Sequence, residues 1–481
     1  MATLEGDITG MGSYIIIAPD GKEYPLSLDD IDSCPPVKKD PQLRQFITSE
    51  EIGEIPRESP PHIPLMRRLE LVDYEPASDV GHFRWYPKGA FLKKLLEDYS
   101  TSTATEWLGA ITIETPLMYR YDVPDIREQA EKFVEKDYRI KLGKKTLLLR
   151  FAGDFGLFRM MKDVQMSYRQ LPVRIFELSP SFRLEKRGEC VGLRRLRSFT
   201  MPDIHCFCRD FDQGVEEFKT LTIFYDKLLK GLELDYVLAF RVVEEYYEKG
   251  RHFLNSLVKE AGRAALIELL PEMKHYWALK SEYQVIDAAG GNAQLSTVQL
   301  DVEDAERYGI TYVDEDGSEK GCIIVHSSVG SIERLIYAML ENASKMASKD
   351  RLPVLPLWVS PTQVRLIPVA DRHAEFSLNV AKHLREAYIR ADVDDRKKTI
   401  GKRIMDAEQK DWVPYIVIVG DKEVEKKVLM VRVRAKSTAD KAFIEELTIE
   451  QLVSKISEKI KDKPFEQQTL PINLSMRPIF I

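Results

Sequence analysis

The stretch FRLEKRGECVGLRRLRSFTMPDIHCF, residues 182–207, decides the fold prediction because it holds the centre of a strand–loop–strand unit. Two strand-like runs, 173–185 and 197–210, flank a polar, basic loop. This pattern predicts an antiparallel hairpin with a long tip.

The second strand of this hairpin carries a possible polar site. Side chains alternate along a strand, so Asp203 and His205 share one face while Cys206 and Cys208 share the other. The Cys-x-Cys spacing differs from the Cys-x2-4-Cys of structural zinc loops, which favours buried core for both cysteines over a metal cluster. Asp203 and His205 are therefore the candidates for chemistry.

The hairpin tip is basic, with Glu185 and Glu189 as its acidic residues. Its six cations are Arg183, Lys186, Arg187, Arg194, Arg195 and Arg197. A solvated loop is one interpretation, but a guanidinium at a strand end can hold a phosphate or carboxylate bidentately. The chain has neither a P-loop nor a Gly-x-Gly-x-x-Gly turn, so bound nucleotide would have to be held by arginines.

A third element, residues 320–342, reads as a strand that leads through Gly330 into an amphipathic helix with Arg334 in its first turn. A cation there opposes the helix dipole unless an anion also binds. A phosphate site and a pairing of Arg334 with Glu333 or a distant carboxylate both remain open. His326, at the strand end, can face the same pocket.

Length and composition indicate a water-soluble protein of several domains. The chain has 481 residues, 44% hydrophobic and 31% charged, which suggests about two to four domains. We find no apolar run of membrane-spanning length and no signal peptide, so we expect a cytoplasmic protein that uses no membrane. Five scattered cysteines predict reduced thiols.

The chain divides by pattern and charge. We expect a small N-terminal appendage over 1–60, a catalytic region over 61–353, and a domain of alternating strands and helices over 354–481. Residues 355–481 hold 23 Lys and Arg against 19 Asp and Glu, which makes this end the better candidate to meet a polyanion. An ordinary solvated surface explains that surplus equally well.

Three elements in order resemble the motifs of class II aminoacyl-tRNA synthetases: a helix and strand ending at Pro116, a strand–loop–strand with FRLE, and a strand–helix with GSIER. The finer pattern is similar to the threonyl-tRNA synthetase family, through DYEPASDVGHFRWYPKGAFL, STVQLD and VHSSVGSIER. The segment VPYIVIVGDKEVEKKVLMVRVR is similar to the anticodon-binding domain of these enzymes. The resemblance implies an α+β catalytic domain, with an antiparallel sheet flanked by helices, and a C-terminal α/β domain.

The resemblance assigns roles around ATP. Arg183 is expected at the α-phosphate and the substrate carboxylate, and Glu185 at the adenine amino group. Phe199 is expected to stack on adenine, and Arg195 and Arg334 to hold the triphosphate. Gln299 is placed with the ATP-binding residues. Substrate contacts are expected from Asp203, Gln294 and Lys280.

The family's catalytic zinc is held by Cys, His and His, and the histidines fall on His205 and His326. The cysteine position reads Asp154 here. Zinc accepts carboxylate oxygen, so a His2Asp set remains a metal site, although loss of the metal stays an alternative. Met201 also departs from the family, which commonly has Gln at that position.

The resemblance implies that this chain joins threonine to tRNA(Thr) through a threonyl-adenylate, using ATP with Mg2+ and the catalytic zinc. Serine differs by one methyl and should be mischarged. About 60 residues precede the catalytic region, too few for the family's editing domain, so a separate trans-editing protein is expected. A prolyl or seryl enzyme and a non-catalytic tRNA-binding paralogue remain alternatives.

Two further expectations concern partners. A homodimer is implied because the first class II motif usually packs across a two-fold interface. Contacts with tRNA are expected from basic residues of the C-terminal domain. These are Arg396, Lys397, Lys402, Arg403 and Arg434.

Overall fold

The computed structural model describes residues 13–54, 59–132, 136–186, 188–347 and 351–480. Contacts between Cα atoms divide the chain into two compact units. The first comprises Met1–Glu58, Thr103–Cys190 and Arg194–Leu335, and the second Ser59–Ser102, Val191–Leu193 and Ile336–Ile481. The domain boundaries expected near residues 60 and 353 stay predictions.

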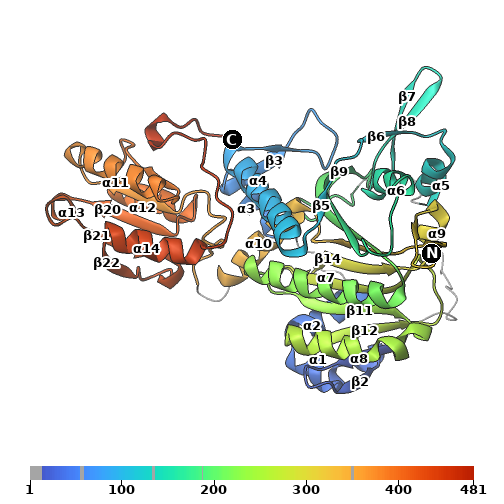
Figure 1. Cartoon of the computed structure of the whole chain (residues 1–481). Coiled ribbons are helices and arrows are strands. Elements are labelled where there is room, and N and C mark those ends of the chain that lie inside the picture. Colours follow the sequence, from blue (N-terminus) through green and yellow to red (C-terminus); the bar gives the residue numbers. More distant parts are fainter. Residues whose placement is uncertain (1–12, 55–58, 133–135, 187, 348–350, 481) are drawn as a thin grey trace, which may run out of the picture. The chain divides into compact units, whose positions relative to one another are not determined.

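The first unit is built on a ten-stranded sheet (Figure 1). In sheet order the strands are β2 (Glu23–Leu26), β1 (Ser13–Ile17), β12 (Ala265–Leu270), β11 (Val237–Val243), β13 (Trp277–Ile286), β14 (Asn292–Asp301), β17 (Ile323–Ser328), β10 (Ser198–Cys208), β9 (Val173–Phe182) and β5 (Ile111–Thr112). The pairs β11–β12 and β5–β9 are parallel and the other pairs are antiparallel. The predicted hairpin is β9–β10, in which Phe182 faces Ser198 across the strands.

Other elements pack on both faces of this sheet and bury its central strands. Every residue of β11 is buried. Helices α7 (Phe211–Gly231) and α8 (Glu244–Ala261) lie along one face (Figure 1). Val237 and Ala239 point to the other face, where they join a hydrophobic core with the N-terminal segment. Residues 13–51 are thus part of the first unit's core.

The remaining elements of the first unit are short. They are η1 (Leu28–Ser33), α1 (Pro35–Lys39), α2 (Pro41–Phe46), η2 (Ile47–Glu51), η3 (Thr103–Trp107), α5 (Pro124–Lys132), α6 (Asp154–Lys162), α9 (Asp304–Tyr308), the sheet of β6 (Met118–Arg120), β8 (Lys145–Leu149) and β7 (Tyr138–Leu142), and the pair β15 (Thr311–Val313) and β16 (Glu319–Gly321). Helix α10 (Ile332–Ala347) begins in this unit and continues into the second.

The second unit contains a five-stranded sheet, with the strand–helix alternation expected of an α/β domain. In sheet order its strands are β19 (Ala391–Val393), β18 (Val364–Pro368), β20 (Tyr415–Val419), β21 (Val428–Val433) and β22 (Ile444–Thr448). The other elements are α3 (His62–Arg68), β3 (Val72–Tyr74), β4 (Phe83–Trp85), α4 (Pro87–Ser102), η4 (Asp371–His373), α11 (Ala374–Glu386), α12 (Ile400–Gln409), α13 (Asp421–Lys426), η5 (Arg434–Lys436), α14 (Ile449–Ile460) and η6 (Leu474–Met476).

Across the described ranges, no helix is both long enough and apolar enough to cross a bilayer.

Candidate active site

Strand register in the first unit brings the polar candidates together on one face. His205 of β10 lies opposite His326 of β17, and His326 lies opposite Gln299 of β14. The two imidazole rings have centroids 5.0 Å apart. Asp154, the first residue of α6, places Oδ1 3.2 Å from Nε2 of His205. Residues that are about 50 to 170 positions apart in sequence thus form one cluster.

The cysteines lie on the opposite face of β10, as the alternation predicts. Cys206 and Cys208 are fully buried. Burial and the nearby Glu217 carboxylate of α7 hold the pKa of the Cys206 thiol well above its usual range. These thiols are core residues on the α7 face.

The electrostatics of the cluster favour a carboxylate beside neutral imidazole. Burial opposes the charge of Asp154, but the hydrogen bond with His205 and the positive groups around it outweigh burial and lower its pKa to about 2. Burial lowers the pKa of His205. Burial, and then the charge of Asp154, raise the pKa of Asp203 well above its ordinary value.

The donor set fits a divalent metal. One ligand atom from each of Asp154, His205 and His326 can be chosen so that all three lie within 4.8 Å of one another. Carboxylate oxygen and imidazole nitrogen are zinc ligands, and three protein ligands leave a position open for substrate. Asp301, Asp304 and His326 form a second group of the same compactness.

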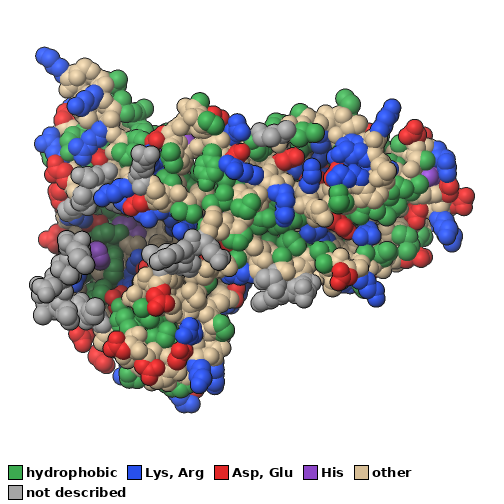
Figure 2. Space-filling model, turned by 180° about the vertical axis from the view of Figure 1, so that it is seen from behind, with side chains coloured by type: hydrophobic (Ala, Val, Ile, Leu, Met, Phe, Trp, Pro, Cys, Tyr) green, Lys and Arg blue, Asp and Glu red, His purple; other side chains and the backbone are tan. Residues whose placement is uncertain are grey.

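A cleft of about 680 Å³ contains this cluster and the nucleotide candidates. In the space-filling view the molecule is hollowed, and histidine side chains show in and beside the hollow (Figure 2). Predicted residues among those that line the cleft are Asp154, Arg183, Glu185, Arg195, Phe199, Asp203, His205, Gln294, Gln299, His326 and Arg334. Lys280 is not among the described lining residues.

Backbone carbonyl groups hold the two central arginines in place. Arg183 donates from Nε to the Phe151 carbonyl oxygen at 3.1 Å, and its guanidinium lies 5.2 Å from the centre of the Phe199 ring. Arg334 donates to the carbonyl oxygens of Arg194, at 3.1 Å, and Gln294, at 2.8 Å. Both guanidinium groups line the cleft.

The other nucleotide candidates contact one another. The Glu185 carboxylate lies 3.1 Å from Lys136 and 3.0 Å from Arg195. Arg195 is also 3.6 Å from Glu189. Glu185 and Arg195, expected at opposite ends of ATP, therefore form an ion pair in this structure.

Lys280 contacts one of the lining residues. Its ammonium donates to Gln294 at 3.2 Å and is 2.6 Å from Glu282. It can orient Gln294, and its own contact with substrate stays a prediction.

Sequence reasoning missed several lining residues. The Tyr276 hydroxyl donates to Gln299 at 2.6 Å, and its ring lies 5.2 Å from that of His326. Lys136 and Glu50 also line the cleft. These residues lie in segments far from the recognised motifs and carry no local pattern that would single them out.

Comparisons with known proteins agree with this arrangement. The family model described as tRNA synthetase class II core domain (G, H, P, S and T) matches residues 138–343, and the model of the anticodon binding domain matches 363–459. A threonine–tRNA ligase of Methanococcus aeolicus is 46% identical over 428 residues, which cover 88% of this chain and 67% of that protein. A threonine–tRNA ligase of Methanosarcina mazei is 41% identical over 487 residues, which cover 99% of this chain and 75% of that protein.

The chain belongs to the threonine–tRNA ligase family.

Solved structures show the same fold. The RNA binding domain of threonyl-tRNA synthetase from Cryptosporidium parvum aligns with a TM-score of 0.71 at 24% identity, covering 84% of this chain and 98% of that one. Prolyl-tRNA synthetase from the same organism aligns with a TM-score of 0.64 at 16% identity, and the alignment covers 83% of this chain and 74% of that one. The expected class II core with an antiparallel sheet, and the anticodon-binding domain, are confirmed.

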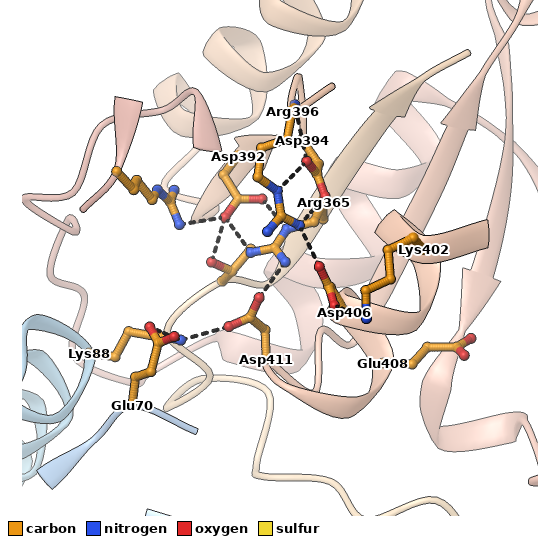
Figure 3. Close-up of polar contacts among 12 residues, drawn as sticks. Glu70, Lys88, Arg365, Asp392, Asp394, Arg396, Lys402, Asp406, Glu408 and Asp411 are labelled. Carbon is orange, nitrogen blue, oxygen red and sulfur yellow. Dashed lines mark hydrogen bonds and ion pairs between the residues drawn. The ribbon is translucent and has the colours of Figure 1, made fainter. Parts of the chain in front are cut away.

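In this threonine–tRNA ligase family member, ion pairs organise the basic candidates of the anticodon-binding domain (Figure 3). Arg396 makes two hydrogen bonds to the buried Asp394, at 2.8 and 2.6 Å. Lys402 lies 3.2 Å from Asp406. Lys397 is exposed to solvent.

Two of the expected tRNA contacts are buried. Arg403 donates to the Asp394 carbonyl oxygen at 2.7 Å. Arg434 donates to the carbonyl oxygens of Pro353 and Glu408, both at 2.7 Å. Their guanidinium groups hold the backbone of the domain, and their roles at tRNA stay predictions.

Proposed function

We propose that this protein attaches threonine to tRNA(Thr) at the expense of ATP, through a threonyl-adenylate. The observation that carries the proposal is that one cleft contains both the Asp154–His205–His326 cluster and the two arginines Arg183 and Arg334. The cluster can select a hydroxylated amino acid, and the two arginines can hold a triphosphate. Family membership supports the same assignment.

At the nucleotide end, catalysis depends on positioned positive charge. The threonine carboxylate attacks the ATP α-phosphorus and pyrophosphate leaves; the terminal ribose hydroxyl of tRNA then attacks the adenylate carbonyl and AMP leaves. Arg183 stabilises the charge that develops at the α-phosphate, and Arg334 holds the triphosphate. Class II synthetases use ATP with Mg2+, which shares this role. No side chain need act as a nucleophile.

At the amino-acid end, selection depends on a hydroxyl group. Asp154, His205 and His326 would hold zinc, which when bound supplies a Lewis acid for the amino group and side-chain hydroxyl of threonine. Asp203 lines the same cleft, and we expect its carboxyl group to accept a hydrogen bond from the threonine hydroxyl. A site that binds a hydroxyl rejects an isostere without one far better than an apolar pocket can.

Pyrophosphate exchange with pure protein, zinc and ATP tests the proposal. We expect exchange with threonine, weaker exchange with serine, and almost none with valine or proline. Proline-dependent exchange without threonine-dependent exchange would assign a prolyl enzyme instead. Absence of exchange with every amino acid, with zinc saturating, would favour the non-catalytic paralogue.

A homodimer is part of the proposal. Strand β5 forms an edge of the large sheet, and its Ile111 is 58% exposed; the chain segments on either side of it carry Trp107, 51% exposed, and Met118, 50% exposed. Exposed apolar groups beside an open strand edge favour association. Light scattering should give twice the chain mass, and Ile111→Lys should shift it toward the monomer.

Serine is expected to be a competing substrate, since it differs from threonine by one methyl group, worth about 1–3 kcal/mol in discrimination. A separate trans-editing partner and a cytoplasmic location stay predictions from the sequence.

A further inference from the structure

His326 contacts a second carboxylate besides the proposed metal cluster. Its Nε2 lies 2.6 Å from Oδ2 of Asp301, the last residue of β14, and both side chains are buried. Strand pairing explains the contact. Gln299 lies opposite His326, so Asp301, two residues further along β14, is a diagonal neighbour on the same face.

The two carboxylate–imidazole distances differ in a way that assigns the ring nitrogens. Two atoms bound to one tetrahedral zinc, at about 2.0–2.1 Å each, lie about 3.3 Å apart. The 3.2 Å between His205 Nε2 and Asp154 Oδ1, a hydrogen-bond distance in this structure, also matches the spacing of two ligands of one metal. The 2.6 Å between His326 and Asp301 is too short for that and is a short hydrogen bond from the ring to a carboxylate. Nε2 of His326 therefore carries a proton, and in the neutral ring that metal binding requires, Nδ1 holds the lone pair.

Backbone donors fix the orientation of the Asp301 carboxylate. Its Oδ1 accepts hydrogen bonds from the backbone N–H groups of Glu303, at 2.8 Å, and Asp304, at 2.9 Å. One oxygen thus faces two backbone donors while the other faces His326. Turning the carboxylate group out of this orientation would break its hydrogen bonds to the two backbone N–H groups and to His326 at the same time.

We propose that Asp301 is a positioning residue that keeps the proton of His326 on Nε2 and so presents Nδ1 to a metal held with Asp154 and His205. A hydrogen bond from the second ring nitrogen to a carboxylate is a common way to orient a ligating histidine. The inference rests on the metal-dependent recognition proposed above.

The neighbouring Asp304 provides a rival explanation. With Asp301 and His326 it could hold a cation directly. The contacts oppose this, because both Asp301 oxygens are already engaged and the Asp304 carboxylate forms an ion pair with Arg307. Asp304→Asn is therefore the matched control.

Asp301→Asn is the informative variant because it keeps the size of the side chain. The two backbone N–H groups require an acceptor, so the amide oxygen faces them and the amide NH2 faces His326. Nε2 must then accept a hydrogen bond, which moves the ring proton to Nδ1. The lone pair that would bind the metal is lost while the backbone turn is preserved.

Competition with a chromogenic chelator measures zinc affinity directly. We expect Asp301→Asn to weaken zinc binding by about 10–100-fold, the usual effect of losing such a partner, and Asp304→Asn to leave it near the wild-type value. ATP affinity, measured separately, should not change in either variant. Wild-type zinc affinity in Asp301→Asn, or equal losses in both variants, would overturn the assignment.

Nitrogen-15 NMR of metal-free protein labelled at histidine tests the tautomer without zinc, with a His326→Gln variant for assignment. We expect the His326 proton on Nε2 in the wild type and on Nδ1 in Asp301→Asn. The same tautomer in both proteins would overturn the role of Asp301. Failure of the wild type to bind zinc would instead overturn the proposed metal-dependent recognition, so the two failures are distinguishable.

Discussion

Arg183 in the first unit is half-buried at the cleft, whereas Arg365 in the second unit is buried, and their surroundings differ. Arg365, of which 1% is exposed, contacts two carboxylates: it makes hydrogen bonds of 2.8 and 2.9 Å to Asp392 and pairs with Asp411 (Figure 3). Arg183 lines the cleft and donates from Nε to a backbone carbonyl oxygen. One guanidinium is held within an ion-pair network and the other faces a cavity.

The pKa shifts follow this difference. Burial opposes the charge of Arg365, but Asp392 and Asp411 outweigh it and raise its pKa well above the usual value. Burial lowers the pKa of Arg183, and the nearby acidic groups do not fully offset it. The charge on Arg183 is therefore under-compensated until an anion binds, whereas that on Arg365 is already used to stabilise the fold. Substitution of Arg183 should therefore lower activity and not stability, whereas substitution of Arg365 should lower stability and not activity.

The largest effect is expected from Arg183→Gln. Loss of a preorganised cation at the reacting phosphate should slow pyrophosphate exchange by about 10²–10³-fold. The melting temperature should not fall, because the substitution removes an under-compensated charge. A variant that loses activity only in proportion to its loss of folded protein would contradict the distinction between the two arginines.

Arg365→Met should lower the stability of the protein and leave its activity per folded molecule nearly unchanged. It removes the cation that Asp392 and Asp411 share and leaves them with Arg477 and Lys88 as their remaining partners, so we expect a loss of about 3 kcal/mol, at the low end for breaking a buried pair. Urea unfolding should show the loss, while exchange per folded molecule stays within about twofold of the wild type. A wild-type unfolding midpoint would disprove a stabilising role for the network.

The same network predicts a pH dependence. The pKa values of Asp392 and Asp411 are both lowered, against burial, by positive partners, with Arg365 first for Asp392 and Lys88 first for Asp411. Groups with depressed folded-state pKa values stabilise the protein above their ordinary pKa, near 3.8, and this contribution is lost as the pH falls below it. The stability difference between wild type and Arg365→Met should therefore shrink under acid conditions.

Metal removal should separate the two ends of the cleft. Treatment with a chelator, or His205→Ala, should reduce threonine-dependent exchange by about tenfold or more, since His205 would be one of the three protein ligands of the proposed metal. ATP affinity should remain, because Arg183 and Arg334 do not belong to the cluster. Restoration by added zinc in the wild type but not in His205→Ala would complete the test. Equal loss of ATP affinity would contradict two separable subsites.

The smallest effects are expected at the anticodon-binding domain. Lys397 is exposed, whereas Lys402 is partly neutralised by Asp406. Lys397→Ala should raise the KM for tRNA a few-fold and lower the salt dependence of binding by about one phosphate contact. Lys402→Ala should change the KM for tRNA and the salt dependence less than Lys397→Ala does. Pyrophosphate exchange without tRNA should not change in either variant. A larger effect from Lys402 would reverse this ranking.

Strand periodicity was enough to predict part of the site. Alternation along residues 197–210 separated Asp203 and His205 from the cysteines, because a strand side chain must point to one face or the other. The strand that carries His326 was equally visible. The pairing of His205 with His326, by contrast, depends on which strands become neighbours, and that information is not local.

The parts that escaped prediction depend on long-range contacts. Asp301 reaches His326 only because β14 pairs with β17. Asp154 was placed through the family resemblance, since a carboxylate at the start of a short helix has no spacing relation to either histidine.

Zinc-edge X-ray absorption of the zinc-loaded protein, with and without threonine, tests whether Asp154, His205 and His326 hold a metal that binds threonine. We expect a first shell made only of nitrogen and oxygen near 2.0–2.2 Å, as Asp154 and two histidines would give. The number of these neighbours should rise when threonine is added but not when valine is added at the same concentration. A sulfur neighbour near 2.3 Å, or a shell that threonine leaves unchanged, would contradict this expectation.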